Sequence, residues 1–416
     1  MQRNAIDLLG IPSPYFRLQQ GGPVPDTEIE GAPCVSFTSY NYLALNGHPA
    51  VRAAATAALE RHGLSATASR LVGGERPEQR ALERRLAAFC GTEDAVAMVS
   101  GHATNVTALG TLLGPEDLVL VDALAHNSVF EGIRLSGAQR RVFAHGDYAG
   151  LEAILSSARA GYRRVLIAVE GLYSMDGDCP DLARLVALKR RYEAWLMVDE
   201  AHALGVLGPT GRGLAEAQGV DPSAVEIWMG TLSKSLGACG GYIAGSGALV
   251  ELLRHTAPGF VFSVGLSPVL AAGALAALDL LEREPDRVAR LAENGRFFRA
   301  AAQDAGLDTG RSEGHAITPV ILGSSLRAVA LSQRLLERGY SVCPIVHPAV
   351  PENQARLRFF ITSEHTPAQL RGAAEATATA LDGLDHALEA RMAALPGRAG
   401  KEASTELQCD CNARQQ

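Results

Sequence analysis

The sequence lacks the features that mark membrane-spanning and secreted proteins. No run reaches the roughly 18 unbroken apolar residues of a membrane helix, and the start, Met1-Gln2-Arg3-Asn4, has no apolar signal core behind it. Seven cysteines are spread thinly over 416 residues, which argues against a disulfide framework. We therefore expect a cytoplasmic protein without a membrane span.

Neither sign of charge dominates the chain. Lysine and arginine number 38 against 45 acidic residues, a net charge of −7 without a long block of one sign, so nucleic acid is not an expected partner. Cys409-Asp410-Cys411 could be a metal or redox pair, but no other cysteine or histidine lies near it in the sequence. We therefore expect no metal. Apolar residues make up 47% of the chain, which is enough for a globular core and favours small-molecule chemistry.

The chain is too long for a single core, since cores stop growing at about 250–300 residues. Prolines and glycines in the first 45 residues predict an extended arm. The pattern then predicts a large domain over 46–285, a small domain over 286–385 and a disordered tail over 386–416.

Short apolar runs alternate with helical stretches up to about residue 285, as in parallel sheets with crossover helices. The predicted strands are Ala95–Val99, Leu118–Val121, Arg141–Ala144, Val165–Val169, Trp195–Val198, Ile227–Met229 and Tyr242–Ala244. A long helix over Pro268–Glu284 precedes a smaller α+β pattern. Its predicted elements are helices over Arg287–Ala305, Ser325–Arg338 and Pro367–Leu381 and strands over Thr318–Leu322, Ser341–Ile345 and Arg356–Ile361.

Lys234 stands in Gly230-Thr231-Leu232-Ser233-Lys234-Ser235-Leu236-Gly237, directly after a predicted strand. A lysine at a strand end, among hydroxyl and glycine residues, can be kept neutral and act as an amine nucleophile. The stretch is not a phosphate-binding P-loop, because Ser233 occupies the position that requires glycine. An exposed loop lysine is the alternative interpretation.

Other polar groups follow neighbouring strands. Asp199 ends a buried strand, where it would point into the crevice in which α/β sheets bind ligands, or would cap the next helix. His126 and Ser174 follow two further strands. Ser100-Gly101-His102 opens a helix whose free amides suit a phosphate. Together with Lys234 and His202, these groups suit pyridoxal 5′-phosphate.

The sequence closely resembles the α-oxoamine synthases, pyridoxal-phosphate enzymes of the aspartate-aminotransferase fold, from about Phe37 to Leu381. The resemblance implies fold type I: a mostly parallel seven-stranded sheet and a smaller C-terminal α+β domain. It rests on seven ordered motifs: Ser39-Tyr40-Asn41-Tyr42-Leu43, Ser100-Gly101, His126-Asn127-Ser128, Glu170 to Asp178, Val198 to His202, Thr231 to Ser235 and Ala355-Arg356-Leu357-Arg358.

The resemblance implies a catalytic set of Lys234, Asp199, His126 and His202. Lys234 would bind the cofactor covalently and move the proton on the substrate α-carbon. Asp199 would pair with the pyridine nitrogen. His126 would stack on the ring, and Ser174 and His202 would bind the region of its hydroxyl group.

The resemblance also implies contacts to the phosphate and the substrate. Gly101, His102 and Thr231 would hold the phosphate on one subunit, and Ser263 would reach it from a second, which implies a homodimer with shared active sites. Arg358 would bind the carboxylate of the amino acid; a surface salt bridge is the alternative.

The reaction implied is a decarboxylative condensation of an amino acid with an acyl thioester, giving an α-amino ketone. An aminotransferase or aldol-type lyase on the same fold is the alternative activity. A catalytically idle partner subunit is a third possibility, although such subunits usually lack the lysine that is present here as Lys234.

Two positions bear on the substrates. The motifs around Tyr40 and Lys234 are most similar to those of serine palmitoyltransferase-like and polyketide-associated members, and Tyr40 would help to bind the carboxylate. Ser69 stands where 5-aminolevulinate synthases have a threonine that excludes substrates larger than glycine, so alanine or serine is favoured, with glycine next. The acyl donor would be acyl-CoA or a separate acyl carrier protein, since the predicted domains leave no room for a fused carrier domain of about 80 residues.

Overall fold

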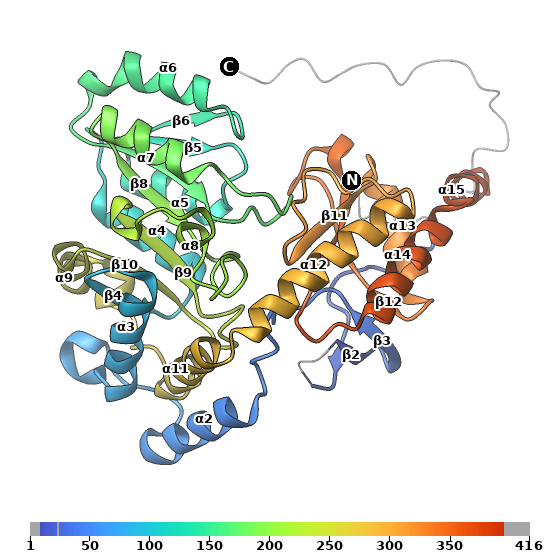
Figure 1. Ribbon diagram of the computed structural model, residues 1–416, viewed down its shortest axis with the longest axis horizontal. Coiled ribbons are helices and arrows are strands. Elements are labelled where there is room, and N and C mark those ends of the chain that lie inside the picture. Colours follow the sequence, from blue (N-terminus) through green and yellow to red (C-terminus); the bar gives the residue numbers. More distant parts are fainter. Residues whose placement is uncertain (1–8, 23–24, 395–416) are drawn as a thin grey trace.

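The computed structural model describes residues 9–22 and 25–394, which form a larger and a smaller lobe (Figure 1). The larger lobe is built on a seven-stranded sheet. Its strands are β4 (Asp94–Met98), β5 (Leu118–Asp122), β6 (Gln139–Phe143), β7 (Val165–Glu170), β8 (Trp195–Asp199), β9 (Ile227–Thr231) and β10 (Gly241–Gly245). All seven predicted strands are therefore present, each within two residues of its expected position.

The sheet has the order β4-β10-β9-β8-β7-β5-β6. Neighbouring strands from β9 to β6 are parallel, whereas β10 runs antiparallel to both β4 and β9. This confirms the predicted mostly parallel sheet of seven strands.

Helices cover both faces of the sheet because the strand residues bury their side chains alternately on either side. In β5, Leu118 and Leu120 belong to one apolar core, whereas Val119 and Val121 belong to the other. The first core includes residues of α2 (Pro49–His62), α3 (Pro77–Cys90), α6 (Tyr148–Ala158), α7 (Leu182–Arg191) and α11 (Pro268–Arg283). The second includes residues of α4 (Gly101–Leu112), α5 (Asn127–Ser136), α9 (Gly247–Thr256) and α10 (Pro258–Val261).

The carboxyl ends of the parallel strands carry polar residues at one edge of the sheet. The last residues of β5, β7, β8 and β9 are Asp122, Glu170, Asp199 and Thr231, and all four are buried. Since parallel strands end on the same side, the fold brings these four groups together.

The smaller lobe contains a three-stranded antiparallel sheet, ordered β11 (Ile317–Ile321), β14 (Arg356–Phe360), β13 (Cys343–Ile345). Its helices are α12 (Asp286–Asp304), α13 (Ser325–Leu336) and α14 (Pro367–Leu381). The predicted strand over Ser341–Ile345 is interrupted at Val342. Its first part, β12 (Tyr340–Ser341), leaves this sheet and pairs with a strand from the start of the chain.

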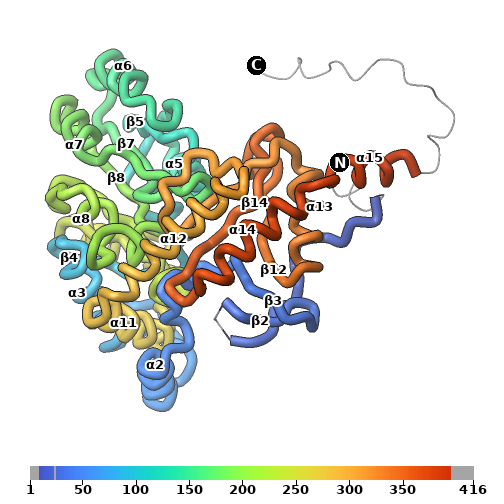
Figure 2. Tube along the Cα trace, turned by 45° about the vertical axis from the view of Figure 1, so that its right-hand side comes forward, coloured from blue at the N-terminus to red at the C-terminus, as the bar shows by residue number. Residues whose placement is uncertain are grey.

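The first 45 residues do more than extend along the surface, which corrects the prediction of a simple arm. Strands β1 (Gln19–Gln20), β2 (Asp26–Ile29) and β3 (Ala32–Ser36) pair antiparallel in sequence order, and β3 pairs parallel with β12. Figure 2 shows these N-terminal strands beside β12 of the smaller lobe. Phe37, directly after β3, packs its ring against Phe298 and Phe359 of that lobe, which fixes the arm.

The predicted tail begins later than residue 386, because α15 (Leu384–Ala393) continues the fold. Leu384 and Leu388 are buried, and Arg391 donates a hydrogen bond to the carbonyl oxygen of Leu9 at 3.1 Å. These contacts stabilise the helix. The rest of the predicted tail, 395–416, lies outside the described residues, together with Cys409 and Cys411.

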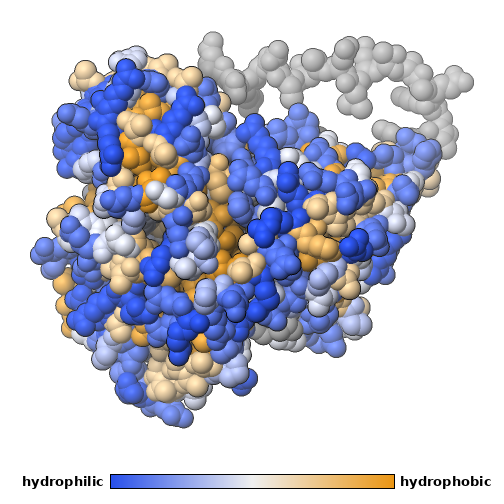
Figure 3. All heavy atoms as spheres, in the orientation of Figure 1, coloured by the Kyte–Doolittle hydropathy of each residue, from blue (hydrophilic) through white to orange (hydrophobic). Residues whose placement is uncertain are grey.

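Surface composition agrees with the charge pattern of the sequence. In Figure 3 polar residues cover most of the visible face, and apolar residues gather in the recess between the two lobes. Among the residues that the structure describes, no helix is long and apolar enough to cross a membrane.

Candidate active site

A cavity of about 220 Å³ opens at the carboxyl ends of β7, β8 and β9. Its lining contains eight of the predicted site residues: Tyr40, Gly101, His102, His126, Asp199, His202, Thr231 and Lys234. A hollow of about 480 Å³ lies at the opposite ends of these strands, next to Trp195 and Ile227. Because that hollow has none of the predicted groups, the smaller cavity is the candidate active site.

Lys234 lies three residues beyond the end of β9 and reaches the cavity. Its Nζ atom is 5.7 Å from the centre of the Tyr40 ring. Burial lowers the pKa of Lys234 to about 8, although Asp199 and Glu170 act in the opposite direction. About a tenth of the amine is therefore unprotonated at pH 7, far more than for an ordinary lysine, and the unprotonated form is the nucleophile.

Asp199 is buried and held by two hydrogen bonds. Its Oδ1 atom accepts from the amide of Ala201 at 3.0 Å, and its Oδ2 atom accepts from Nδ2 of Asn105 at 2.8 Å. The same amide of Asn105 donates to the hydroxyl of Ser128 at 2.9 Å. These contacts hold the carboxylate at the cavity wall.

Two histidines face the cavity from different loops. His126 caps α5, and its Nδ1 atom lies 2.7 Å from the hydroxyl of Ser128. Nδ1 of His202 lies 2.7 Å from the hydroxyl of Tyr42. Desolvation lowers the pKa of both rings, and that of His202 lies well below its ordinary value. Both imidazoles are therefore neutral at physiological pH.

The amino end of α4 also opens into the cavity. Ser100 caps this twelve-residue helix, so the amides of Gly101 and His102 have no acceptor within it. A Cβ atom on Gly101 would lie 2.9 Å from Oγ1 of Thr231, so only glycine allows the strand and the helix to meet this closely. Free amides at a helix amino end suit a phosphate group.

Four predicted residues lie outside the lining of this cavity. Ser174 and Arg358 are buried next to it: Nη1 of Arg358 donates to the carbonyl oxygen of Ser174 at 2.9 Å. The guanidinium lies over the ring of Phe360, 4.5 Å from its centre, and the same ring lies 4.7 Å from that of Tyr40. Arg358 and Tyr40 therefore converge from the smaller lobe and the N-terminal segment.

Ser69 and Ser263 lie together on another part of the surface. Ser69 precedes a short π-helix over Arg70–Gly74, and Ser263 follows α10. The two segments are joined by a hydrogen bond of 3.0 Å from the amide of Gly265 to the carbonyl oxygen of Ala68. Neither serine is among the residues that line the cavity of its own chain.

The sequence-based set omits four residues that shape the site: Tyr42, Asn105, Ser128 and Glu170. Tyr42, Ser128 and Glu170 lie inside the family motifs, which could have indicated them. Asn105 lies outside these motifs, on the helix that begins after Ser100. Burial, followed by the charge of Asp199, raises the pKa of Glu170 to about 8. Glu170 Oε2 accepts from the amide of Ser174 at 3.0 Å, which fixes the loop after β7.

A half-buried histidine joins two of the loops at this edge of the sheet. Nδ1 of His145 lies 3.1 Å from both carboxylate oxygens of Asp122, and its Nε2 lies 2.8 Å from Oδ2 of Asp178. Burial alone would lower the pKa of His145, but hydrogen bonds to the two carboxylates raise it to about 9. The charged imidazolium therefore ties the loop that holds His126 to the loop that holds Ser174.

This arrangement predicts a pH dependence of stability. Since the pKa of His145 in the folded chain exceeds its ordinary value of about 6.5, its contribution is complete below pH about 6.5 and is lost as the pH rises through about 9. Between these pH values we expect the free energy of unfolding of the wild type to fall by about 1–2 kcal/mol more than that of His145→Gln. Urea unfolding at both pH values measures this difference. His255→Gln, at an exposed histidine, is the control, and equal losses in wild type and His145→Gln would contradict the prediction.

Comparisons with a family pattern and with known relatives agree on one family of enzymes. The sequence pattern of the aminotransferase class I and II family matches residues 32–376. An 8-amino-7-oxononanoate synthase of Beijerinckia indica is 43% identical over 338 residues, which cover 81% of this chain and 85% of the relative. One of Geobacter sulfurreducens is 44% identical over 351 residues, covering 84% of this chain and 89% of the relative.

Comparison with a solved structure points to the same family. A serine palmitoyltransferase of Sphingomonas wittichii superposes with a TM-score of 0.88 at 32% identity, covering 92% of this chain and 96% of the other. The chain belongs to the aminotransferase class I and II family and has the fold of the type I pyridoxal-phosphate enzymes. Within that family it is an α-oxoamine synthase, an acyltransferase that condenses with decarboxylation. This confirms the predicted family, fold, reaction class and cofactor.

Independently of these comparisons, the residues of the cavity suit pyridoxal 5′-phosphate. It combines an amine of lowered pKa, a buried carboxylate and a helix amino end. Within the part of the chain that the structure describes, two buried oxygens of its lining, Oδ1 of Asn105 and Oε1 of Glu170, have no hydrogen-bond partner. Unpartnered buried oxygens at a cavity wall indicate a polar ligand.

Proposed function

We propose that this enzyme condenses a small amino acid, alanine or serine in preference to glycine, with an acyl-CoA or acyl-carrier-protein thioester. The convergence of Lys234, Asp199, His126 and His202 on one cavity, with Arg358 buried beside it, is the observation that carries the proposal. The direct test is to incubate the enzyme, the cofactor and a panel of thioesters with each amino acid, and to measure carbon dioxide and amino ketone. No product across the panel would contradict it.

The proposed catalytic roles follow from position and charge. When bound, pyridoxal phosphate accepts the electrons of the substrate α-carbon. Lys234, with its pKa near 8, would hold the cofactor and move the α-proton. Asp199 would keep the pyridine nitrogen protonated, and the neutral ring of His126 would pack against the cofactor. Ser174 and His202 would bind the region of the ring hydroxyl.

We propose that the phosphate of the cofactor binds at the amino end of α4. The amides of Gly101 and His102 would donate to it, and so would the hydroxyl of Thr231, which now donates to the carbonyl oxygen of Gly240 at 2.9 Å. Donation by backbone amides suits the dianion.

Arg358 is proposed to bind the substrate carboxylate. Its guanidinium is fixed by Phe360 and by the carbonyl oxygen of Ser174, so a bidentate pair with a carboxylate costs little further ordering. The hydroxyl of Tyr40, whose ring packs against the same phenylalanine, would provide a second contact to the carboxylate.

We propose a homodimer in which each subunit completes the other's site. Exposed apolar side chains surround Ser69 and Ser263: Leu64, Leu71, Val72, Phe262 and Val264. The exposed fraction of Phe262 is 86%, and a cluster of this kind on a folded surface indicates an interface. Ser263 would contact the phosphate bound by the partner subunit, and Ser69 would face the partner's substrate.

A mixing experiment tests the shared site. Lys234→Ala and Ser263→Asp chains, the second with a carboxylate facing the proposed phosphate position, should each be inactive or strongly impaired alone and regain activity as co-expressed hybrids, because one of the two sites then draws only on intact segments. Sedimentation of the wild type should give twice the mass of the chain. A monomeric, fully active enzyme would contradict the proposal.

Ser69 provides a specificity prediction. Ser69→Thr adds one methyl group where the side chain of the substrate would lie, so the ratio of kcat/KM for alanine to that for glycine should fall about 10- to 200-fold. Ser65→Thr, at a serine on the same segment, is the control. An unchanged ratio would show that Ser69 does not limit substrate size.

The alternative activities make different predictions. An aminotransferase or aldol-type lyase would turn over an amino acid without any thioester, so turnover that does not depend on the donor separates these activities from the proposed one. Competition between acyl-CoA and an acylated carrier protein identifies the donor.

We also propose a cytoplasmic location. The five cysteines among the described residues, Cys34, Cys90, Cys179, Cys239 and Cys343, all have free thiols, as expected in a reducing compartment. Alkylation of chains from intact cells under non-reducing conditions would test this, and a recovered disulfide would contradict it.

A further inference from the structure

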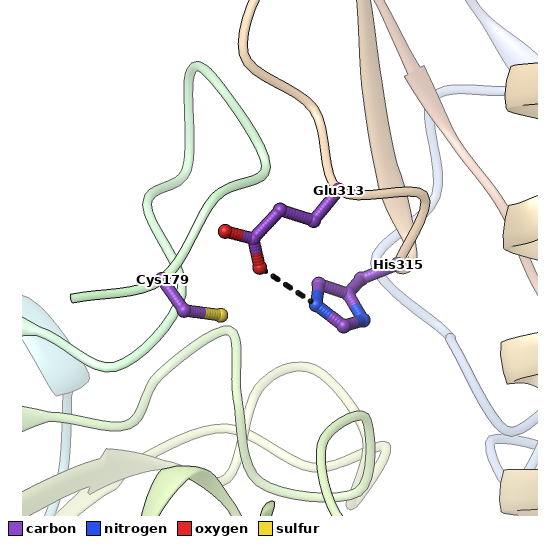
Figure 4. Close-up of side chains that lie close together, drawn as sticks. All are labelled: Cys179, Glu313 and His315. Atoms are coloured by element: carbon purple, nitrogen blue, oxygen red, sulfur yellow. Dashed lines mark hydrogen bonds and ion pairs between the residues drawn. The ribbon is translucent and has the colours of Figure 1, made fainter. Parts of the chain in front are cut away.

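Three side chains with metal-binding atoms converge outside the active site. Cys179 lies on the loop between β7 and α7, and Glu313 and His315 lie on the loop between α12 and β11. One ligand atom from each lies within 4.8 Å of the others. Figure 4 shows the thiol of Cys179 and the carboxylate and imidazole of the other two pointing into the same space between the two loops.

The distances suit a tetrahedral ion. Nε2 of His315 lies 3.3 Å from Oε2 of Glu313, and bonds of about 2.0–2.1 Å from one tetrahedral ion place two such atoms about 3.3 Å apart. The sulfur would need to lie about 3.6 Å from each of them, given a bond of about 2.3 Å. The three ligand atoms already lie within 4.8 Å of one another, so the sulfur is at most about 1.2 Å further away than this geometry requires.

The two loops are already held together, so the cluster is preorganised. The amide of Glu313 donates to the carbonyl oxygen of Gly177 at 3.1 Å. Gly177 has a φ of +75°, and a Cβ atom at this position would lie 2.2 Å from the carbonyl oxygen of Ile317. Only glycine allows this approach. Arg356 adds an ion pair with Asp176, at 2.7 Å.

We propose that Cys179, Glu313 and His315 form a zinc site that clasps the two lobes together. Sulfur and imidazole nitrogen favour Zn²⁺ over Mg²⁺ and Ca²⁺, which take oxygen ligands. Binding displaces the thiol proton of Cys179 to solvent and leaves one tetrahedral position for water. Side-chain exposures of 30% for His315 and 49% for Glu313 give the ion a path from solvent.

The experiment uses the untagged holoenzyme after chelation and dialysis. Co²⁺ serves as the probe, because its visible bands in a tetrahedral site lie at longer wavelengths than the absorption of the cofactor. We expect one Co²⁺ per chain, displaced by Zn²⁺ and not by Mg²⁺. Cys179→Ser and His315→Gln should each weaken binding about tenfold or more, and Zn²⁺ should raise the Tm of the wild type but not of Cys179→Ser.

Two controls separate this site from other thiols. Cys239→Ser removes an exposed cysteine elsewhere and should bind Co²⁺ as the wild type does. Cys409→Ser/Cys411→Ser removes the cysteine pair near the end of the chain and should also bind normally. Loss of binding in this double variant with retention in Cys179→Ser would overturn the proposal, as would the absence of bound Co²⁺ in the wild type.

Discussion

Lys234→Ala should abolish covalent attachment of the cofactor and reduce kcat by about 10³-fold or more. The amine provides both the attachment point and the base for the α-proton, and proton transfer by a positioned group alone contributes about 10²–10⁴-fold. The chain has only three lysines, Lys189, Lys234 and Lys401, so the measurement is unusually clean. Borohydride reduction followed by peptide mass analysis should find the cofactor on the peptide that contains residue 234.

Lys189→Arg is the matched control for this variant. Lys189 forms an ion pair with Glu226, which arginine can retain, so this variant should keep cofactor attachment and turnover. Borohydride-stable cofactor on Lys234→Ala would show that another amine holds it, and retention of turnover in that variant would contradict the role of Lys234 as base.

Asp199→Asn should reduce kcat about 30- to 3,000-fold. Removing one partner of a buried, hydrogen-bonded charge pair costs at least about 2 kcal/mol and up to about 4.7 kcal/mol, which converts to that range of rate. We expect the variant to fold, because Asn105 can rotate its amide and present Oδ1, which has no partner among the described residues, to the new amide group. Single-turnover kinetics and cofactor absorbance as a function of pH measure the effect.

Glu200→Gln controls for the loss of a buried carboxyl group. Glu200 follows Asp199 in the sequence but turns away from the cavity and accepts a hydrogen bond from the amide of Leu214 at 3.1 Å. Burial raises the pKa of Glu200 to about 8, so the neutral glutamine resembles its form at pH 7. If Glu200→Gln loses as much activity as Asp199→Asn, the loss in Asp199→Asn reflects the removal of any buried carboxyl group and not a specific role of Asp199.

The central sheet was predictable because its strands are buried on both faces. Leu118–Val121 and Val165–Val169 are continuous apolar runs, and such runs indicate interior parallel strands. The break at Val342 had no such signal. Tyr340 and Ser341 leave the small sheet because β3, some three hundred residues earlier, offers them a pairing partner, and the local sequence does not encode a contact of this kind.

The residues of the candidate site also fall into two groups, those that the sequence indicates and those that only the structure reveals. Charged and ring-bearing groups at strand ends, such as Lys234 and Asp199, are visible in the sequence because their chemistry is distinctive and their position follows from the strand pattern. Asn105 is a neutral amide in the middle of a helix, and its importance arises from a hydrogen bond to Asp199, 94 residues away. The three-dimensional structure is needed to find such a residue.

The reversed strand β10 has a consequence for how the enzyme is made. β4 is an edge strand whose neighbour in the sheet is β10, so β4 and the amino end of α4 cannot take their places until the ribosome has delivered Gly241–Gly245. Arg358 arrives later still. Pairing between distant segments slows folding, and the nascent chain therefore cannot capture its cofactor in the native site until most of its synthesis is complete.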